Sequence, residues 1–190
     1  MPLSSIRTYN RTPYRISEKT LNLYIRFLIV FIRALFKPRM ATLDTSVLHF
    51  HVLPNDLDLN RHMNNGRYLS IMDLGRIDLM TRIGLFTLAR KNGWLPVVGT
   101  VHMRYRRPLK LFQPFELQTR IVYWDEKWVF IEQVMISRGK VCALGTVQGL
   151  IRAKEGNVPT SYLMEQLGLD QARPDMTDDV KLLEQFKGLE

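Results

Sequence analysis

The spacing of apolar and polar residues divides the chain into an N-terminal helix, a central region of strands around one long helix, and a helical end. Residues 17–36 form a nearly continuous apolar run that Lys37 and Pro38 end, which predicts a helix with Ser17 as its N-cap. Residues 1–16 are polar and basic without periodicity, so we expect a flexible tail. The predicted divisions are a tail at 1–16, an amphipathic helix at 17–40, a folded domain at 41–158 and a helical extension at 159–190.

The folded domain is predicted to begin with a strand, because residues 45–52 have strand composition and two distinct faces. A polar loop follows, and then apolar residues recur at threes and fours from Tyr68 to Met80. This period predicts a long helix capped by Asn64 or Asn65. A second short helix is expected at 85–92. Four later segments have strand composition and are separated by short breaks: 95–106, 114–125, 127–138 and 140–154.

This order of elements predicts an α+β fold in which one antiparallel sheet wraps around the long central helix. Within 114–125, Arg120 alternates with apolar neighbours, so we expect one face of the sheet to be wetter than the other. A sheet of this kind has two free edges, whose unpaired backbone groups favour pairing with a second copy. We therefore expect a homodimer and leave a tetramer open.

The densest group of polar side chains lies in the loop that leads into the central helix: Asp56, Asp58, Asn60, His62, Asn64 and Asn65. Backbone N–H groups at a helix N-terminus, together with the positive end of the helix dipole, can hold an oxyanion. A carboxylate beside them can act as base or nucleophile, and a histidine can move a proton. The same residue types are ordinary turn and cap residues, so both interpretations stay open on residue types alone.

Several segments resemble one family. DLDLNRHMNN resembles the DLDxNxHVNN motif of plant acyl-acyl-carrier-protein thioesterases, and an Asp ten residues before Tyr68 resembles the 4-hydroxybenzoyl-CoA thioesterase group of hotdog proteins. HMNNGRYL, RYRRPLKLFQPFEL, YWDEKW and KVCALG are similar to thioesterase superfamily member six and its bacterial relatives. The resemblance covers residues 45–155. It implies a hotdog fold that hydrolyses acyl-CoA or acyl-carrier-protein thioesters in lipid metabolism, with no cofactor or metal.

The resemblance also implies roles for residues of the polar loop. Asp58 matches the carboxylate that acts as general base or nucleophile, while Asn60 and His62 match residues that orient or activate water. The plant enzymes use a further glutamate downstream, but no acidic residue lies between Asp78 and Glu116. This departure favours a mechanism carried mainly by Asp58.

The helix start is expected to bind the substrate. Backbone N–H groups from Asn64 through Asn65 to Gly66 would polarise the thioester carbonyl, and Tyr68 matches a position near the helix start in the family. Gly66 lets a ligand or partner backbone approach closely. Asp56 is interpreted as a turn residue. An apolar tunnel along the central helix would hold the acyl chain, with Ile71, Met72 and Val98 in its lining.

The net charge of the chain limits the classes of ligand that it is expected to bind. A formal charge of +9 is compatible with nucleic acid, anionic lipid or a phosphate-bearing ligand. Zinc-finger spacing and RNA-binding aromatic signatures are absent from the sequence, so nucleic acid is not expected. Arg104, Arg106 and Arg107 form a basic cluster that suits the phosphates of coenzyme A or, equally, a solvated strand end. Alternation places Arg104 and Arg106 on one face and Arg107 on the other.

Metal and thiol chemistry are not expected. His49 and His51 share a strand face, but no nearby third ligand accompanies them. The single cysteine, Cys142, lies in an apolar run, which predicts a core residue rather than a reactive thiol. A chain without a disulfide fits a reducing compartment such as the cytoplasm.

The helix at 17–36 has two interpretations. It is short for a membrane span and is interrupted by Arg26 and Arg33. Either its apolar surface packs on the domain or on a dimer partner, or it lies in a membrane interface with the arginines at the headgroups. The second possibility motivates an alternative function, a non-catalytic protein that binds acyl ligands or a membrane. A hotdog hydratase is a third alternative, disfavoured because no proline separates Asp58 from His62.

Overall fold

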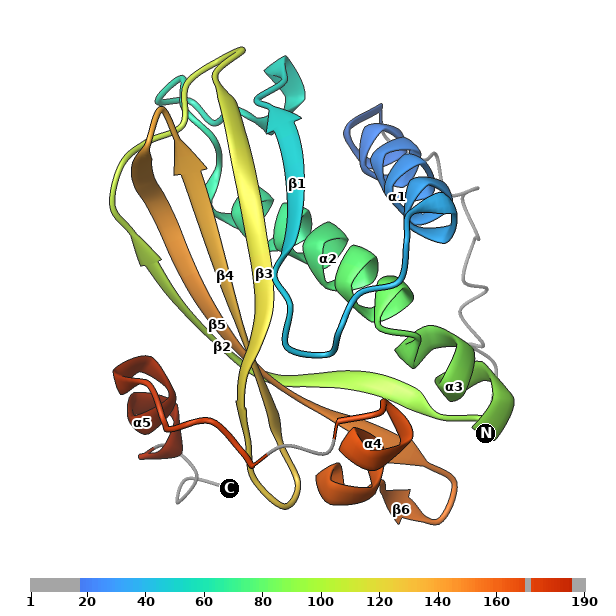
Figure 1. The fold of residues 1–190 in the computed structure, drawn as a ribbon. Coiled ribbons are helices and arrows are strands. Elements are labelled where there is room, and N and C mark those ends of the chain that lie inside the picture. Colours follow the sequence, from blue (N-terminus) through green and yellow to red (C-terminus); the bar gives the residue numbers. More distant parts are fainter. Residues whose placement is uncertain (1–17, 170–171, 186–190) are drawn as a thin grey trace, which may run out of the picture.

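The computed structural model describes residues 18–169 and 172–185 (Figure 1). Its helices are α1 (Glu18–Phe36), the 3-10 helix η1 (Pro54–Asp56), α2 (Asn65–Arg82), α3 (Leu85–Asn92), α4 (Thr160–Gln166) and α5 (Asp178–Glu184). Its strands are β1 (Ser46–His51), β2 (Leu95–Tyr105), β3 (Pro114–Trp124), β4 (Val129–Ser137), β5 (Lys140–Ala153) and β6 (Gly156–Asn157). The predicted tail at 1–16 and the predicted cap Ser17 lie outside the described residues.

The sheet curls around α2, as Figure 1 shows, and this confirms the predicted α+β architecture. Its strand order is β1-β3-β4-β5-β2 with antiparallel pairing throughout. β1 and β2 form the two edges, and the short strand β6, which was not predicted, pairs with β5. All four long strand predictions and the helix at 85–92 agree with the structure to within two residues.

Helix α2 approaches the sheet closely at Gly75. A Cβ atom there would collide with the side chains of Thr119 and Leu117, so the missing side chain sets the distance between helix and sheet. Gln133 of β4 fixes this contact, because its Nε2 donates to the carbonyl of Met72 at 2.8 Å and to Thr119 Oγ1 at 3.1 Å. The helix therefore holds a fixed place in the curve of the sheet.

The expected wetter face holds for only part of β3. Arg120 is exposed, whereas Val122, Tyr123 and Trp124 are all buried. The strand bulges between Ile121 and Tyr123, and α5 covers the outer face there with buried apolar residues of its own. The C-terminal extension thus buries part of a sheet face that alternation alone predicts to be exposed to solvent.

Helix α1 packs on the domain through its polar stripe. Arg26 Nη2 pairs with the buried carboxylate of Asp56 at 2.8 Å, and Lys37 Nζ pairs with that of Asp78 at 3.0 Å. Val30 and Ala34 are the buried apolar residues of α1 between them. One of the two interpretations of this helix places Arg26 at lipid headgroups, whereas in the structure its guanidinium lies inward against a buried carboxylate.

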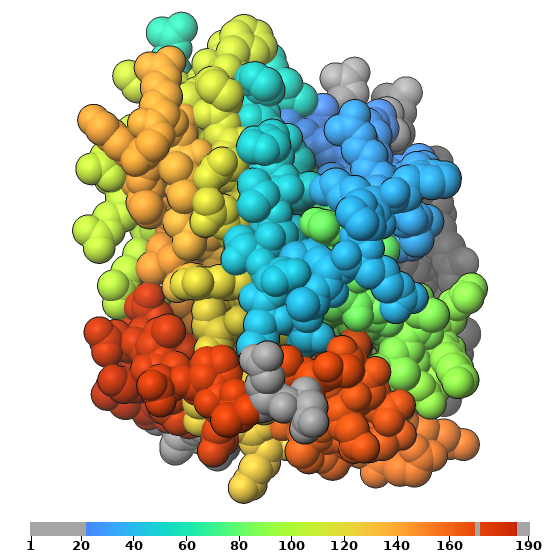
Figure 2. Space-filling view, viewed as in Figure 1, coloured from blue at the N-terminus to red at the C-terminus, as the bar shows by residue number. Residues whose placement is uncertain are grey.

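The apolar residues of α1 consequently face outward. Figure 2 shows α1 on the outside of the molecule beside β1. Its large exposed apolar side chains are Tyr24, Ile25, Phe27, Leu28, Ile29, Ile32, Leu35 and Phe36. We call these eight side chains the α1 apolar face.

Candidate active site

The polar loop before α2 is a tight turn built by its own backbone. The N–H of Asp58 donates to the carbonyl of His62 at 2.9 Å, and the N–H of Arg61 donates to the carbonyl of Asp58 at 3.1 Å. Arg61 has φ 61°, a left-handed conformation that closes the turn. Leu57 and Met63 pair on either side. This geometry holds Asp58 and His62 across from one another.

Asp56 has a structural position. It is 1% exposed, and its carboxylate accepts hydrogen bonds from Arg26 at 3.1 and 2.8 Å and from the N–H of Leu53 at 2.8 Å. Arg67 Nε lies 3.4 Å from its Oδ1. The interpretation of Asp56 as a turn residue is correct, since it ends η1, but the buried ion pair to α1 was not predicted.

Asp58 is placed differently, although it lies only two residues away. Its side chain is 21% exposed, and Oδ1 accepts a hydrogen bond from the backbone N–H of Asn60 at 2.8 Å. His62 Nδ1 is 3.6 Å from Oδ2, which is too long for a hydrogen bond. Among the described residues, Asp58 Oδ2 accepts no hydrogen bond. One carboxylate oxygen therefore stays available to a substrate or a water molecule.

The start of α2 presents one backbone donor. Asn64 is the N-cap, and its Oδ1 accepts from the N–H of Gly66 at 2.9 Å, while its carbonyl accepts from the N–H of Arg67 at 2.8 Å. Within the part of the chain that the structure describes, the N–H of Asn65 has no hydrogen-bond partner. Asn64, Asn65 and Gly66 are all exposed. The Asn65 amide, at the positive end of α2, is thus open to an oxyanion.

Tyr68 and Tyr105 support this end of the helix. Tyr68 is buried, its hydroxyl accepts a hydrogen bond from the N–H of Leu109 at 3.3 Å, and its ring packs edge-on against Tyr105 at 5.2 Å. Burial raises the pKa of Tyr68, and the charge of Asp58 raises it further. The Tyr105 hydroxyl donates to the carbonyl of Asn65 at 3.3 Å. Tyr105 was not predicted, although strand alternation places it on the same face as Met103.

The three predicted arginines do not converge. Arg104 pairs with Asp179 of α5 at 2.5 Å, and Arg107 Nη1 donates to the carbonyl of Val141 at 2.8 Å. Arg106 is exposed. Lys110, which follows Pro108 in the same basic segment, pairs through its backbone with His62 and brings a further cation to the polar loop.

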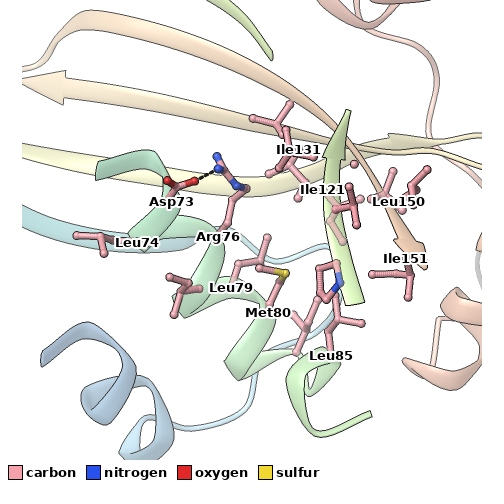
Figure 3. A pocket seen from close by; sticks show the side chains of 18 of the residues that line it. Asp73, Leu74, Arg76, Leu79, Met80, Leu85, Ile121, Ile131, Leu150 and Ile151 are labelled. Carbon is pink, nitrogen blue, oxygen red and sulfur yellow. Dashed lines mark hydrogen bonds and ion pairs between the residues drawn. The ribbon is translucent and has the colours of Figure 1, made fainter. Parts of the chain in front are cut away.

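A cavity of about 450 Å³ lies along α2 (Figure 3). Its walls come from α1, α2, α4 and the sheet, and nearly all are apolar. Val98 lines it, as predicted. Ile71 and Met72 do not, because both are fully buried in a separate part of the core. Their face of α2 meets the sheet, whereas the cavity follows the face that carries Ser70 and Met80.

One polar pair lies in this apolar cavity. Arg76 and Asp73 form an ion pair, and Arg76 Nη1 donates to Gln133 Oε1 at 2.6 Å. Burial lowers the pKa of the Arg76 guanidinium, and the charge of Asp73 acts in the opposite direction. Asp73 is largely exposed, so the pair lies at the rim. Arg76 was not predicted, although a cation three residues after an aspartate on a buried helix is a recognisable signal.

Comparison with known proteins identifies the family. The profile of the "Thioesterase-like superfamily" matches residues 52–181. The chain belongs to the thioesterase-like superfamily. The Danio rerio protein THEM6 is 38% identical over 162 residues, which is 83% of this chain and 78% of that protein. A probable thioesterase of Saccharomyces cerevisiae is 25% identical over 182 residues, 84% of this chain and 79% of that protein. Membership supports thioester hydrolysis in general.

Solved structures agree with the fold of this superfamily. The Escherichia coli probable thioesterase YbaW has a TM-score of 0.61 at 20% identity, over 65% of this chain and 96% of that protein. The Staphylococcus aureus protein SAV2348, solved in complex with CoA, has a TM-score of 0.58 at 16% identity, over 74% of this chain and 92% of that protein. The predicted hotdog fold is confirmed.

Proposed function

We propose that the protein hydrolyses acyl-CoA thioesters at the junction of the polar loop and α2. The observation that carries the proposal is the presence of two open groups in one short stretch of chain, one in the polar loop and one at the start of α2. Asp58 keeps one unbonded carboxylate oxygen, and the N–H of Asn65 at the start of α2 has no partner among the described residues. A base beside an oxyanion donor is what acyl transfer to water requires.

In the proposed reaction, Asp58 takes a proton from water as the water oxygen attacks the thioester carbonyl carbon. The carbonyl oxygen becomes an oxyanion, which the Asn65 N–H and the helix dipole stabilise. The tetrahedral intermediate then collapses and its C–S bond breaks. The leaving thiolate takes the proton back from Asp58, which gives a carboxylic acid and free thiol. In the alternative route Asp58 itself attacks, forming an anhydride that water then cleaves. In both routes His62 positions the water through its ring, and the backbone N–H of Asn60 orients the Asp58 carboxylate.

CoA is the proposed carrier. SAV2348, which shares the fold, was solved with CoA, and this chain carries basic residues near the polar loop. We assign the phosphates to the exposed Arg106 and to Lys110, whose backbone pairs with His62, because Arg104 and Arg107 are engaged with Asp179 and the carbonyl of Val141. Release of free thiol from acyl-CoAs of graded chain length tests the proposal. Absence of release from every acyl-CoA, with release from an acyl-carrier-protein conjugate, would contradict CoA as carrier.

A homodimer through the edge of β2 is part of the proposal. β2 pairs on one side only, with β5, and Val101 and Tyr105 in its C-terminal half are exposed. We place the dimer contact at this half, because Val97 and Val98 in the N-terminal half line the cavity. An edge strand with apolar side chains favours pairing with a second copy. Sedimentation should give twice the chain mass of 22.3 kDa, and a particle of a single chain mass would contradict the dimer.

Contact with a lipid surface is a second proposal, and the α1 apolar face supports it. No helix in the described ranges 18–169 and 172–185 is long and apolar enough to cross a membrane. The α1 apolar face instead suits a helix lying in the interface, where the net charge of +9 favours anionic lipid.

Substitution within the α1 apolar face should release the protein from lipid. The double variant Leu28→Glu, Ile32→Glu places two charges at exposed sites. Its recovery with floated vesicles of phosphatidylcholine and phosphatidylglycerol should fall at least about tenfold. Leu111→Glu is the matched control, because Leu111 is exposed but lies outside α1. Equal flotation of the double variant and the wild type would contradict lipid contact.

A further inference from the structure

The cavity along α2 and the α1 apolar face share residues. Tyr24 and Phe27 line the cavity and are also 62% and 40% exposed. Val97 and Val98 of β2 line it as well, and both are exposed. The cavity therefore meets the surface where α1 and β2 approach it, at the border of the α1 apolar face.

The position of α1 relative to this opening is fixed by buried charge. Arg26, near the middle of α1, is anchored to Asp56, and Lys37, directly after its last residue, is anchored to Asp78. Asp78 also accepts a hydrogen bond from Ser46 at 2.6 Å. Rotating α1 would leave both buried carboxylates without these cations, which is strongly unfavourable. A lipid surface that meets the α1 apolar face therefore meets the cavity opening too.

The interior of the cavity leads toward the proposed catalytic end of α2. Its lining begins at Ser70, whose hydroxyl donates to the carbonyl of Gly66 in the first turn of the helix. Beyond Arg76 the walls are aliphatic, and Figure 3 shows Leu79, Met80 and Leu85 with Ile121, Leu150 and Ile151 around this deeper part. A linear acyl chain can lie along this wall with its thioester toward Asn65.

From this continuity we infer that the protein takes long-chain acyl thioesters sideways out of a lipid surface. The acyl chain passes from the bilayer between α1 and β2 into the cavity, while the CoA moiety stays on the aqueous side. A chain that moves directly between two apolar environments is not exposed to water, and this advantage grows with every CH₂ group. The inference rests on the proposed function and specifies its substrates as long-chain thioesters that partition into membranes.

The test compares two presentations of one substrate. Palmitoyl-CoA is supplied either in vesicles of phosphatidylcholine and phosphatidylglycerol or bound to serum albumin, and thiol release is measured in both. The readout is the ratio of the vesicle rate to the albumin rate. For the double variant Leu28→Glu, Ile32→Glu, this ratio should fall at least about tenfold below the wild-type ratio. The control Leu111→Glu should keep the wild-type ratio.

A tether separates sideways delivery from simple concentration of the enzyme at the membrane. A C-terminal hexahistidine on nickel-chelating lipid holds wild type and double variant on vesicles equally. If delivery runs through the α1 side, the tethered double variant keeps its low ratio, whereas restoration to the wild-type ratio overturns the inference. An unchanged ratio in the untethered double variant also overturns it. Absence of thiol release from both presentations contradicts the proposed function instead.

Discussion

Replacing Asp58 with Asn should abolish most thioester hydrolysis while leaving the fold intact. General acid–base catalysis contributes about a hundred- to ten-thousand-fold in rate, and Asn cannot accept the proton of water. We expect kcat/KM for acyl-CoA to fall by about a thousandfold. The folded state should tolerate the change, because Asp58 is part-exposed and an Asn oxygen can still accept the hydrogen bond from the N–H of Asn60.

The measurement is thiol release under saturating and limiting substrate, with sedimentation and thermal unfolding as checks on the oligomeric state and the fold. Asp175→Asn is the matched control, since Asp175 is an exposed aspartate of the C-terminal segment. An Asp58→Asn protein whose activity stays within about tenfold of wild type would remove Asp58 from the proposed chemistry.

Replacing Asp56 with Asn should instead lower the stability of the folded protein by a large amount. This carboxylate is buried and faces Arg26 and Arg67. Removing one partner of a buried ion pair costs about 3 kcal/mol or more, because the remaining charge is left uncompensated. We expect the free energy of unfolding to fall by about 3 kcal/mol and α1 to loosen from the loop.

Urea unfolding of the two variants side by side measures this contrast, because Asp58→Asn is a same-type substitution two positions away. Proteolysis within α1 provides an independent readout of its attachment. A loss below about 1 kcal/mol for Asp56→Asn, the range of exposed ion pairs, would show that the Arg26–Asp56 pair contributes little to the folded state.

The features predicted well from sequence are those set by local pattern. Apolar spacing placed α2 and the four long strands, and the expected cap at Asn64 accepts the Gly66 amide. The helix expected at 85–92 ends where Gly93 adopts φ 66°, a conformation that glycine takes without strain. These signals reside within a few residues and need no knowledge of distant partners.

The features missed depend on contacts between distant segments. Asp56 and Asp58 have the same side chain and nearly the same place in the sequence, and the buried ion pair to Arg26, thirty residues earlier, marks Asp56 as structural. Ile71 and Met72 are buried against the sheet because Gly75 of α2 lies in contact with Thr119 and Gln133 of the sheet. Periodicity identifies an apolar face of a helix but not which neighbour covers it, so the cavity lining was only partly predicted.

The inward polar stripe of α1 has a consequence for how the protein would be extracted from cells. A peripheral protein held by charge leaves the membrane in a high-salt wash, because salt screens exposed charges. Here Arg26 and Lys37 are engaged with buried carboxylates, and the surface offered to lipid is apolar. If the α1 apolar face meets lipid as proposed, salt would leave the protein on the membrane and detergent would remove it, as for an integral protein, although no described helix can span the bilayer.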